Sequence, residues 1–182
     1  MKIVVLGWGS LIWDPGNLKI KSKWQKDGPI LPIEFARISK GGRLTLVIFE
    51  EFPSLQVLWN YMDFDDVTKA INNLKERERT PDVNNIGYIN LLQETQRSKN
   101  DNISLIIGDW VKTKQIDAII WSDFRSNFED NFGDKFTLEN VIKYLDELPL
   151  KRKIEAQNYI VNAPEQIQTK FRRDIQKNLE WY

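Results

Sequence analysis

The stretch that decides the fold is IVVLGWGSLIWDP, residues 3–15. Its first four residues are apolar, a run too short for a helix and typical of a buried strand. Gly7 and Gly9 follow, and because glycine tolerates positive φ, the backbone can turn sharply there. Successive N–H groups in such a turn can point inward together and form a concave site for a carboxylate or an oxyanion. These residues leave two interpretations open, an anion-binding loop or a tight turn at a strand end.

The same glycines also begin the dinucleotide-binding pattern G-x-G-x-x-G. The third glycine position holds Ile12, however, and DPG at residues 14–16 breaks the chain where the phosphate-binding helix should run. The sequence therefore argues against a Rossmann or P-loop nucleotide site.

The composition narrows the available chemistry. The 182 residues include 26 Lys and Arg and 26 Asp and Glu, so no net field attracts nucleic acid or an anionic membrane. There is no cysteine and no histidine, which removes disulfides, thiol nucleophiles, Ser-His dyads and the usual zinc sites. Proton transfer must then use carboxylates, lysines, tyrosines or the backbone. Without a signal-peptide core or an apolar span of membrane length, we expect a cytoplasmic protein with no membrane segment.

Short apolar segments joined by turns predict a small mixed barrel in the first part of the chain. The expected later strands are residues 30–38, 44–49, 55–62, 86–92 and 103–107. From residue 109 the pattern turns helical. Helices are expected at 137–148, at 151–161 and from Pro164 onward. We predict an α+β fold, with a barrel and its crossing helix in residues 1–108 and a helical extension in 109–182 packed on the barrel.

One carboxylate stands out on the helix expected at residues 63–79. Val67, Ile71 and Leu74 follow helical spacing on one face, and continuing that stripe leads to Glu78. Burial would disfavour the charged form of Glu78 and raise its pKa, as a general acid/base near neutral pH requires. Two plainer interpretations stay open, a frayed helix end or an ion pair with a neighbouring arginine.

The loop and this helix both resemble the γ-glutamylcyclotransferase-like superfamily, over about residues 1–108. The strand followed by WGSL at residues 8–11 is similar to the family signature Tyr-Gly-Ser-Leu. LKERER at residues 74–79 is similar to Leu-Asp-x-x-Glu-Gly, in which the final Glu is the catalytic acid/base. The resemblance places that role on Glu78. The substrate-binding residues that it implies are Gly7, Trp8, Gly9, Ser10, Leu11 and Tyr88.

The activity that the resemblance implies is cyclotransfer on a γ-glutamyl amide or peptide. The α-amine of the substrate attacks its own γ-carbonyl, and an amine and 5-oxoproline are released without metal or cofactor. Trp8, Lys75 and Arg79 depart from the family pattern, where Tyr, Asp and Gly are usual. The alternative is a catalytically silent member of the fold that binds a small amino-acid-like ligand, or a protein partner through its C-terminal helices.

Overall fold

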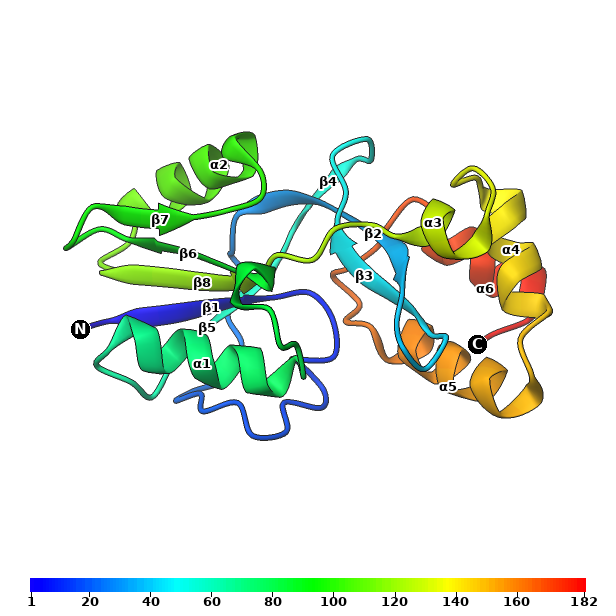
Figure 1. The fold of residues 1–182 in the computed structure, drawn as a ribbon, viewed down its shortest axis with the longest axis horizontal. Helices are drawn as coiled ribbons and strands as arrows, with labels where there is room; N and C mark the ends of the chain where they lie inside the picture. The colour runs from blue at the N-terminus through cyan, green and yellow to red at the C-terminus, as the bar shows by residue number, and fades with distance from the viewer. The chain divides into compact units, whose positions relative to one another are not determined.

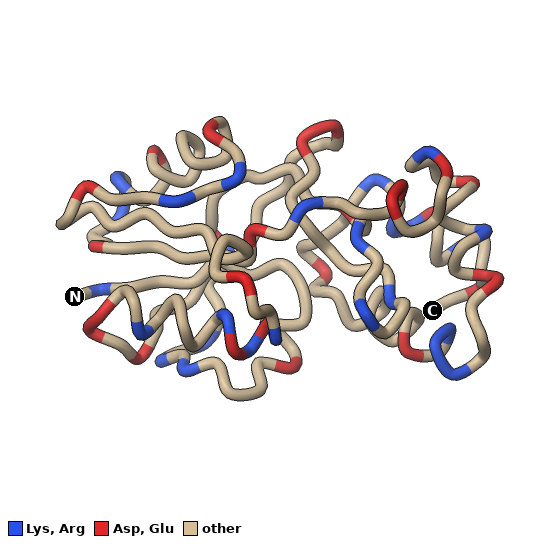
Figure 2. The backbone as a smooth tube through the Cα atoms, viewed as in Figure 1, with Lys and Arg blue, Asp and Glu red and all other residues tan.

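The computed structural model describes residues 1–182 and divides the chain into two compact units. Unit 1 comprises Met1–Leu31 and Gln56–Phe124, and unit 2 comprises Pro32–Leu55 and Arg125–Tyr182. The backbone therefore passes from one unit to the other three times (Figure 1). Basic and acidic residues are interspersed along both units, as Figure 2 shows, in keeping with the net charge of zero.

Unit 1 is built on a five-stranded mixed sheet. Its strands, in spatial order, are β5 (Leu58–Tyr61), β1 (Ile3–Gly7), β8 (Ala118–Ser122), β6 (Ile86–Asn90) and β7 (Thr95–Arg97). Only β1 and β8 run parallel, and the other neighbours are antiparallel. The two central strands β1 and β8 are almost wholly buried, as expected for strands covered on both faces.

One helix covers each face of this sheet (Figure 1). Helix α1 (Val67–Arg77) begins at Asp66, whose side chain accepts a hydrogen bond from the Lys69 N–H, as an N-cap does. Its apolar stripe packs on β6 and β8. Helix α2 (Asp101–Lys112) lies on the opposite face, capped in the same way by Asn100. A short 3₁₀ turn, η1 (Val83–Asn85), leads into β6.

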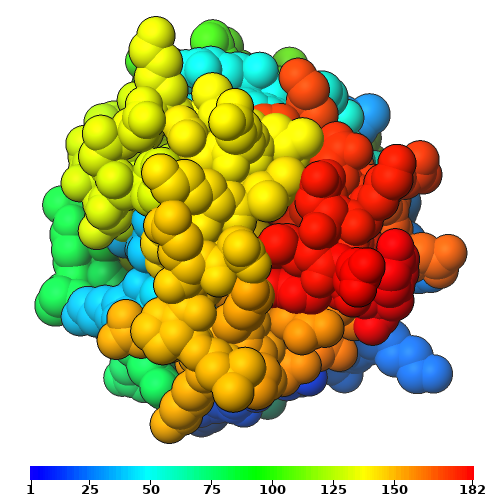
Figure 3. Space-filling model, turned by 90° about the vertical axis from the view of Figure 1, so that its right-hand side faces the viewer, coloured from blue at the N-terminus to red at the C-terminus, as the bar shows by residue number.

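Unit 2 combines a three-stranded sheet with four helices. The strand order is β3 (Leu44–Ile48), β2 (Ile30–Ile38) and β4 (Ser54–Gln56). The helices are α3 (Phe128–Phe132), α4 (Leu138–Asp146), α5 (Leu150–Asn162) and α6 (Arg172–Leu179). Helix α5 packs on β3, and α4 contacts both α5 and α6, which lie side by side with it in Figure 3. Edge-to-face phenylalanine contacts, such as Phe128 with Phe136, join these elements into the core of the unit.

The α+β class predicted from the sequence is confirmed. The strands form two open sheets with free edges, and neither closes into a barrel. The boundary expected near Gly108 falls inside α2, and the strands β2 and β3 belong to the same unit as the C-terminal helices.

Four predictions of secondary structure were wrong. The single strand expected at 55–62 is two strands in different sheets, β4 and β5. The strand expected at 103–107 is part of α2, because Ile103, Ile107 and Val111 recur every four residues and form its buried face. The strand β8, in a segment expected to be helical, was missed. The last helix begins at Arg172 rather than near Pro164.

Candidate functional site

The carboxyl ends of β1 and β8 lie side by side in unit 1. Ile3 is in register with Ala118 and Val5 with Ile120, and β1 ends at Gly7 while β8 ends at Ser122. The loop predicted as an anion site, residues 7–11, starts from this edge. Ligands of α/β sheets commonly bind at the carboxyl ends of parallel strands, so this edge is a suitable place for a site.

The loop turns back tightly after β1. The Ile12 N–H donates to the Gly9 carbonyl at 3.0 Å, and the Asp14 N–H donates to the Ser10 carbonyl at 2.9 Å. Trp8 and Leu11 are buried, while Ser10 is partly exposed. The backbone N–H groups of Gly9, Ser10 and Leu11 donate to no protein acceptor. These three donors are therefore unpaired within the protein.

Gly7 serves a different purpose from the one expected. Its φ is not positive, so no left-handed conformation explains the glycine. A Cβ at this position would lie 2.6 Å from ring carbons of Trp24, far too close for a side chain. The glycine is required because the Trp24 ring packs directly against the backbone at the end of β1.

Arg77, in the last turn of α1, fixes the chain that follows the loop. Its Nη2 donates to the Ser10 hydroxyl at 2.9 Å and to the Asp14 carbonyl at 2.7 Å. Its Nε donates to the Pro15 carbonyl at 3.1 Å. Arg77 was considered from the sequence as an ion-pair partner of Glu78, but its hydrogen bonds instead connect α1 to the loop.

Glu78 is the C-cap of α1 and is partly buried. Its Oε1 accepts a hydrogen bond from the Ser122 hydroxyl at 2.8 Å, and it forms no ion pair. Burial raises the pKa of the Glu78 carboxyl, against smaller opposing effects of the Ser122 hydrogen bond and the Arg77 charge. The direction agrees with the expectation from the sequence. A raised carboxyl pKa is the direction of shift that a general acid/base near neutral pH needs.

Tyr88 lies on the face of the five-stranded sheet that also carries Ser122, the hydrogen-bond partner of Glu78. It pairs with Ile120 on β8, two residues before Ser122, and packs against the core beneath α1. On its other side it pairs with Arg97 of β7, whose guanidinium carbon lies 5.2 Å from the centre of the Tyr88 ring. The structure therefore brings Glu78, Tyr88 and the start of the loop to one region of unit 1.

Ser122 contacts Glu78 and Arg97 contacts Tyr88, and neither residue was predicted from the sequence. The signal for Ser122 was a polar residue directly after the apolar run AIIW at residues 118–121. Arg97 gave no comparable signal, because its position depends on the pairing of β6 with β7.

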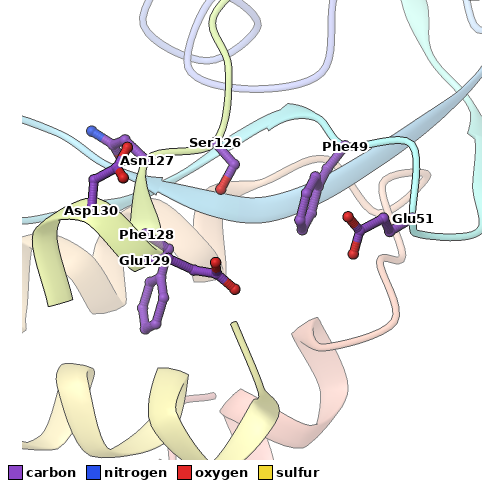
Figure 4. Close-up of a pocket in the computed structure, with 7 residues that line it drawn as sticks. All are labelled: Phe49, Glu51, Ser126, Asn127, Phe128, Glu129 and Asp130. Carbon is purple, nitrogen blue, oxygen red and sulfur yellow. The ribbon is translucent and has the colours of Figure 1, made fainter. Parts of the chain in front are cut away.

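Two surface hollows of the structure do not have Glu78 in their lining. One, of about 200 Å³, is in unit 2 and is lined by Phe49, Glu51, Ser126, Asn127, Phe128, Glu129 and Asp130. Figure 4 shows the Glu51 and Glu129 carboxylates pointing toward the same opening. The other, of about 180 Å³, lies at the turn between β6 and β7. No group of three or more acidic side chains in the chain is arranged to hold a metal ion.

Comparison of the chain with protein-family models and with curated proteins found no match. None of its helices has the length and apolar character needed to cross a membrane. A functional proposal for this chain therefore depends on the chemistry of its own residues.

Proposed function

We propose that the protein is a cyclotransferase that acts on a γ-glutamyl amide or peptide and releases an amine and 5-oxoproline. The observation that carries the proposal is the Glu78 carboxyl, whose pKa is raised by burial. It is held by Ser122 at the edge where β1 leads into the 7–11 loop. We also propose that unit 1 is an opened form of the γ-glutamylcyclotransferase-like fold.

The reaction needs little besides positioning and proton transfer. The substrate α-amine attacks its own γ-carbonyl, a new C–N bond closes the five-membered ring, and the old C–N bond to the leaving amine breaks. Nucleophile and electrophile belong to one molecule, so holding the chain in a bent conformation supplies much of the acceleration. The two protons lost by the attacking ammonium are the two that the leaving nitrogen gains. One carboxyl can relay them in turn, which is the role we assign to Glu78.

The loop supplies the electrostatic part of the proposal. When the amine attacks, the γ-carbonyl oxygen becomes an oxyanion, and N–H donors fixed in advance stabilise such a charge. The free N–H groups of Gly9, Ser10 and Leu11 are suited to this role. Arg77 keeps the loop in place through Ser10, Asp14 and Pro15 rather than by neutralising Glu78.

The test is release of 5-oxoproline from a panel of γ-glutamyl amines and peptides. We expect Glu78→Gln to lower the rate by at least about 100-fold, the low end for a lost general acid/base. Glu76→Gln is the matched control, because Glu76 is exposed on the same helix and the change removes the same charge. This control should keep the wild-type rate.

Two results would contradict the proposal. Equal activity of wild type and Glu78→Gln would show that Glu78 does not transfer the proton. No activity in any protein, together with binding of glutamate to the wild type, would favour the catalytically silent member of the fold that binds an amino-acid-like ligand.

A further inference from the structure

Arg97 ends the edge strand β7 with a buried donor that has no acceptor. Because β7 stops at this residue, the carbonyl of Ile86 has no strand partner on that side, and Arg97 Nε donates to it at 3.0 Å. The Nη2 atom on the same edge of the guanidinium is buried and donates to nothing in the protein. A buried polar group without a partner is destabilising, so such a group calls for an explanation.

Arg97 and Glu78 are connected through paired residues of neighbouring strands on one face of the sheet. Arg97 pairs with Tyr88, so both side chains leave the sheet on the α1 face. The Ile86 that receives the Nε hydrogen bond pairs in turn with Ser122, the hydrogen-bond partner of Glu78. The Arg97 guanidinium therefore contacts β6, and the Glu78 carboxyl contacts β8, the strand next to it in the sheet.

The environment holds Arg97 in one orientation before any ligand binds. The Tyr88 ring lies beneath the guanidinium carbon at 5.2 Å, and the Ile86 carbonyl fixes the Nε edge. A guanidinium fork fixed in this way is suited to a planar carboxylate. Arg97 forms no ion pair with any acidic side chain of the protein.

A second buried donor without an acceptor belongs to the same part of unit 1. The indole Nε1 of Trp24 is buried and has no partner, and the Trp24 ring packs against Gly7 and the core beneath α1. Among buried side-chain atoms, this face of the sheet has two unsatisfied donors and no unsatisfied acceptor. An anionic ligand is the kind of ligand that such an arrangement favours.

We infer that Arg97 is a carboxylate-binding residue and holds the α-carboxylate of the glutamyl substrate while the ring closes. The identity of that carboxylate rests on the proposed function, whereas an anion-binding role for Arg97 does not. With the carboxylate held at Arg97, the 7–11 loop is left for the oxyanion. The substrate is then held at the carboxylate next to its attacking α-amine, and at the γ-carbonyl oxygen by the loop.

The test compares two lactams that differ only in the carboxylate, 5-oxoproline and 2-pyrrolidinone, by calorimetry. The wild type should bind 5-oxoproline at least about tenfold more tightly, since a hydrogen bond to a charged group contributes about 1.5–3 kcal/mol. Arg97→Gln should remove this preference, and Arg97→Lys should keep part of it. The matched control is Arg173→Gln, which removes the same charge at an exposed position in α6.

Steady-state kinetics supply the second readout. Arg97→Gln should raise the KM for a γ-glutamyl amide by about 10- to 100-fold and change kcat less. Thermal melting shows whether the variant folds. If Arg97→Gln does not fold, the comparison of lactam preference between the wild type and Arg97→Lys tests whether Arg97 binds the carboxylate.

The outcomes separate this inference from the proposed function. Carboxylate preference that depends on Arg97, without turnover, upholds the inference and overturns the cyclotransferase. Turnover by the wild type, with a KM and a lactam preference that both stay unchanged in Arg97→Gln, upholds the cyclotransferase and overturns the inference. Absence of both turnover and lactam preference in the wild type overturns both.

Discussion

Each unit contains one carboxyl group whose pKa is raised by burial, and the two are held very differently. Glu34, on β2 in unit 2, is fully buried. Its Oε1 accepts from the Phe35 N–H at 2.8 Å and its Oε2 from the Phe171 N–H at 3.1 Å. The Thr169 hydroxyl and the Lys170 N–H also donate to it. Glu78 in unit 1 is only partly buried and accepts one side-chain hydrogen bond, from Ser122.

The difference shows that a raised pKa alone does not identify a functional group. Glu34 joins β2 to the segment that leads into α6, and its donors occupy both oxygens. A ligand could reach it only by breaking those bonds. Glu78 keeps one carboxyl oxygen without a protein partner. A perturbed pKa indicates a functional site when the group is also accessible and incompletely satisfied.

The largest contrast in stability should appear when each carboxyl is exchanged for an amide. Glu34→Gln places an NH₂ group against N–H and O–H donors, so we expect the free energy of unfolding to fall by about 1–3 kcal/mol. Glu78→Gln should not lower it at pH 7. The raised pKa means that the native protein binds this proton more tightly than the unfolded chain. Native stability is therefore lost as pH rises from the ordinary glutamate pKa to the raised one, and an uncharged amide avoids that loss.

Urea unfolding of both variants at pH 7 measures the contrast. Equal losses of unfolding free energy in Glu34→Gln and Glu78→Gln would remove the distinction between a structural and a functional carboxyl.

The next effect concerns the hydroxyl beside Glu78. The Ser122 hydrogen bond lowers the pKa of Glu78, so Ser122→Ala should raise that pKa further. The acid limb of the pH dependence of kcat/KM should then move to higher pH. A pH profile that stays in place would show that Ser122 does not control the protonation of Glu78.

The smallest expected effect comes from removing a hydroxyl that donates to Glu34, the change that matches Ser122→Ala. Thr169→Val keeps the side-chain shape but removes the hydroxyl that donates to the Glu34 carboxyl. We expect a loss of about 1 kcal/mol in unfolding free energy and no change in the pH profile of activity. A shifted pH profile would connect unit 2 to the reaction and contradict the comparison.

The part of the site that could be predicted from sequence is the part encoded in local periodicity. The stripe of Val67, Ile71 and Leu74 identifies α1 and places Glu78 at its end, because helical spacing is a property of one short segment. The glycine loop was also found, although Gly7 is explained by the Trp24 ring rather than by positive φ.

The other residues of the candidate site, and the division into two units, depend on which distant segments of the chain pair. Ser122 and Arg97 acquire their positions from the β1–β8 and β6–β7 pairings, which no local pattern encodes. The apolar run at 103–107 fits a buried strand or a buried helix equally well. In the structure it is helical, and the Asn100 side chain caps the start of that helix. The two-unit division was missed for the same reason, because it groups β2 and β3 with helices that follow about a hundred residues later.

The parallel pairing of β1 with β8 also determines when unit 1 can fold. Ile3 and its partner Ala118 are 115 residues apart in the chain, since 118 − 3 = 115. At translation rates of roughly 5–20 residues per second, β1 leaves the ribosome on the order of ten seconds before the strand it must lie beside. During that interval one edge of an apolar strand lacks its partner, which favours wrong pairings and slow folding. Nascent chains of this protein should therefore depend on chaperones until β8 has been synthesised.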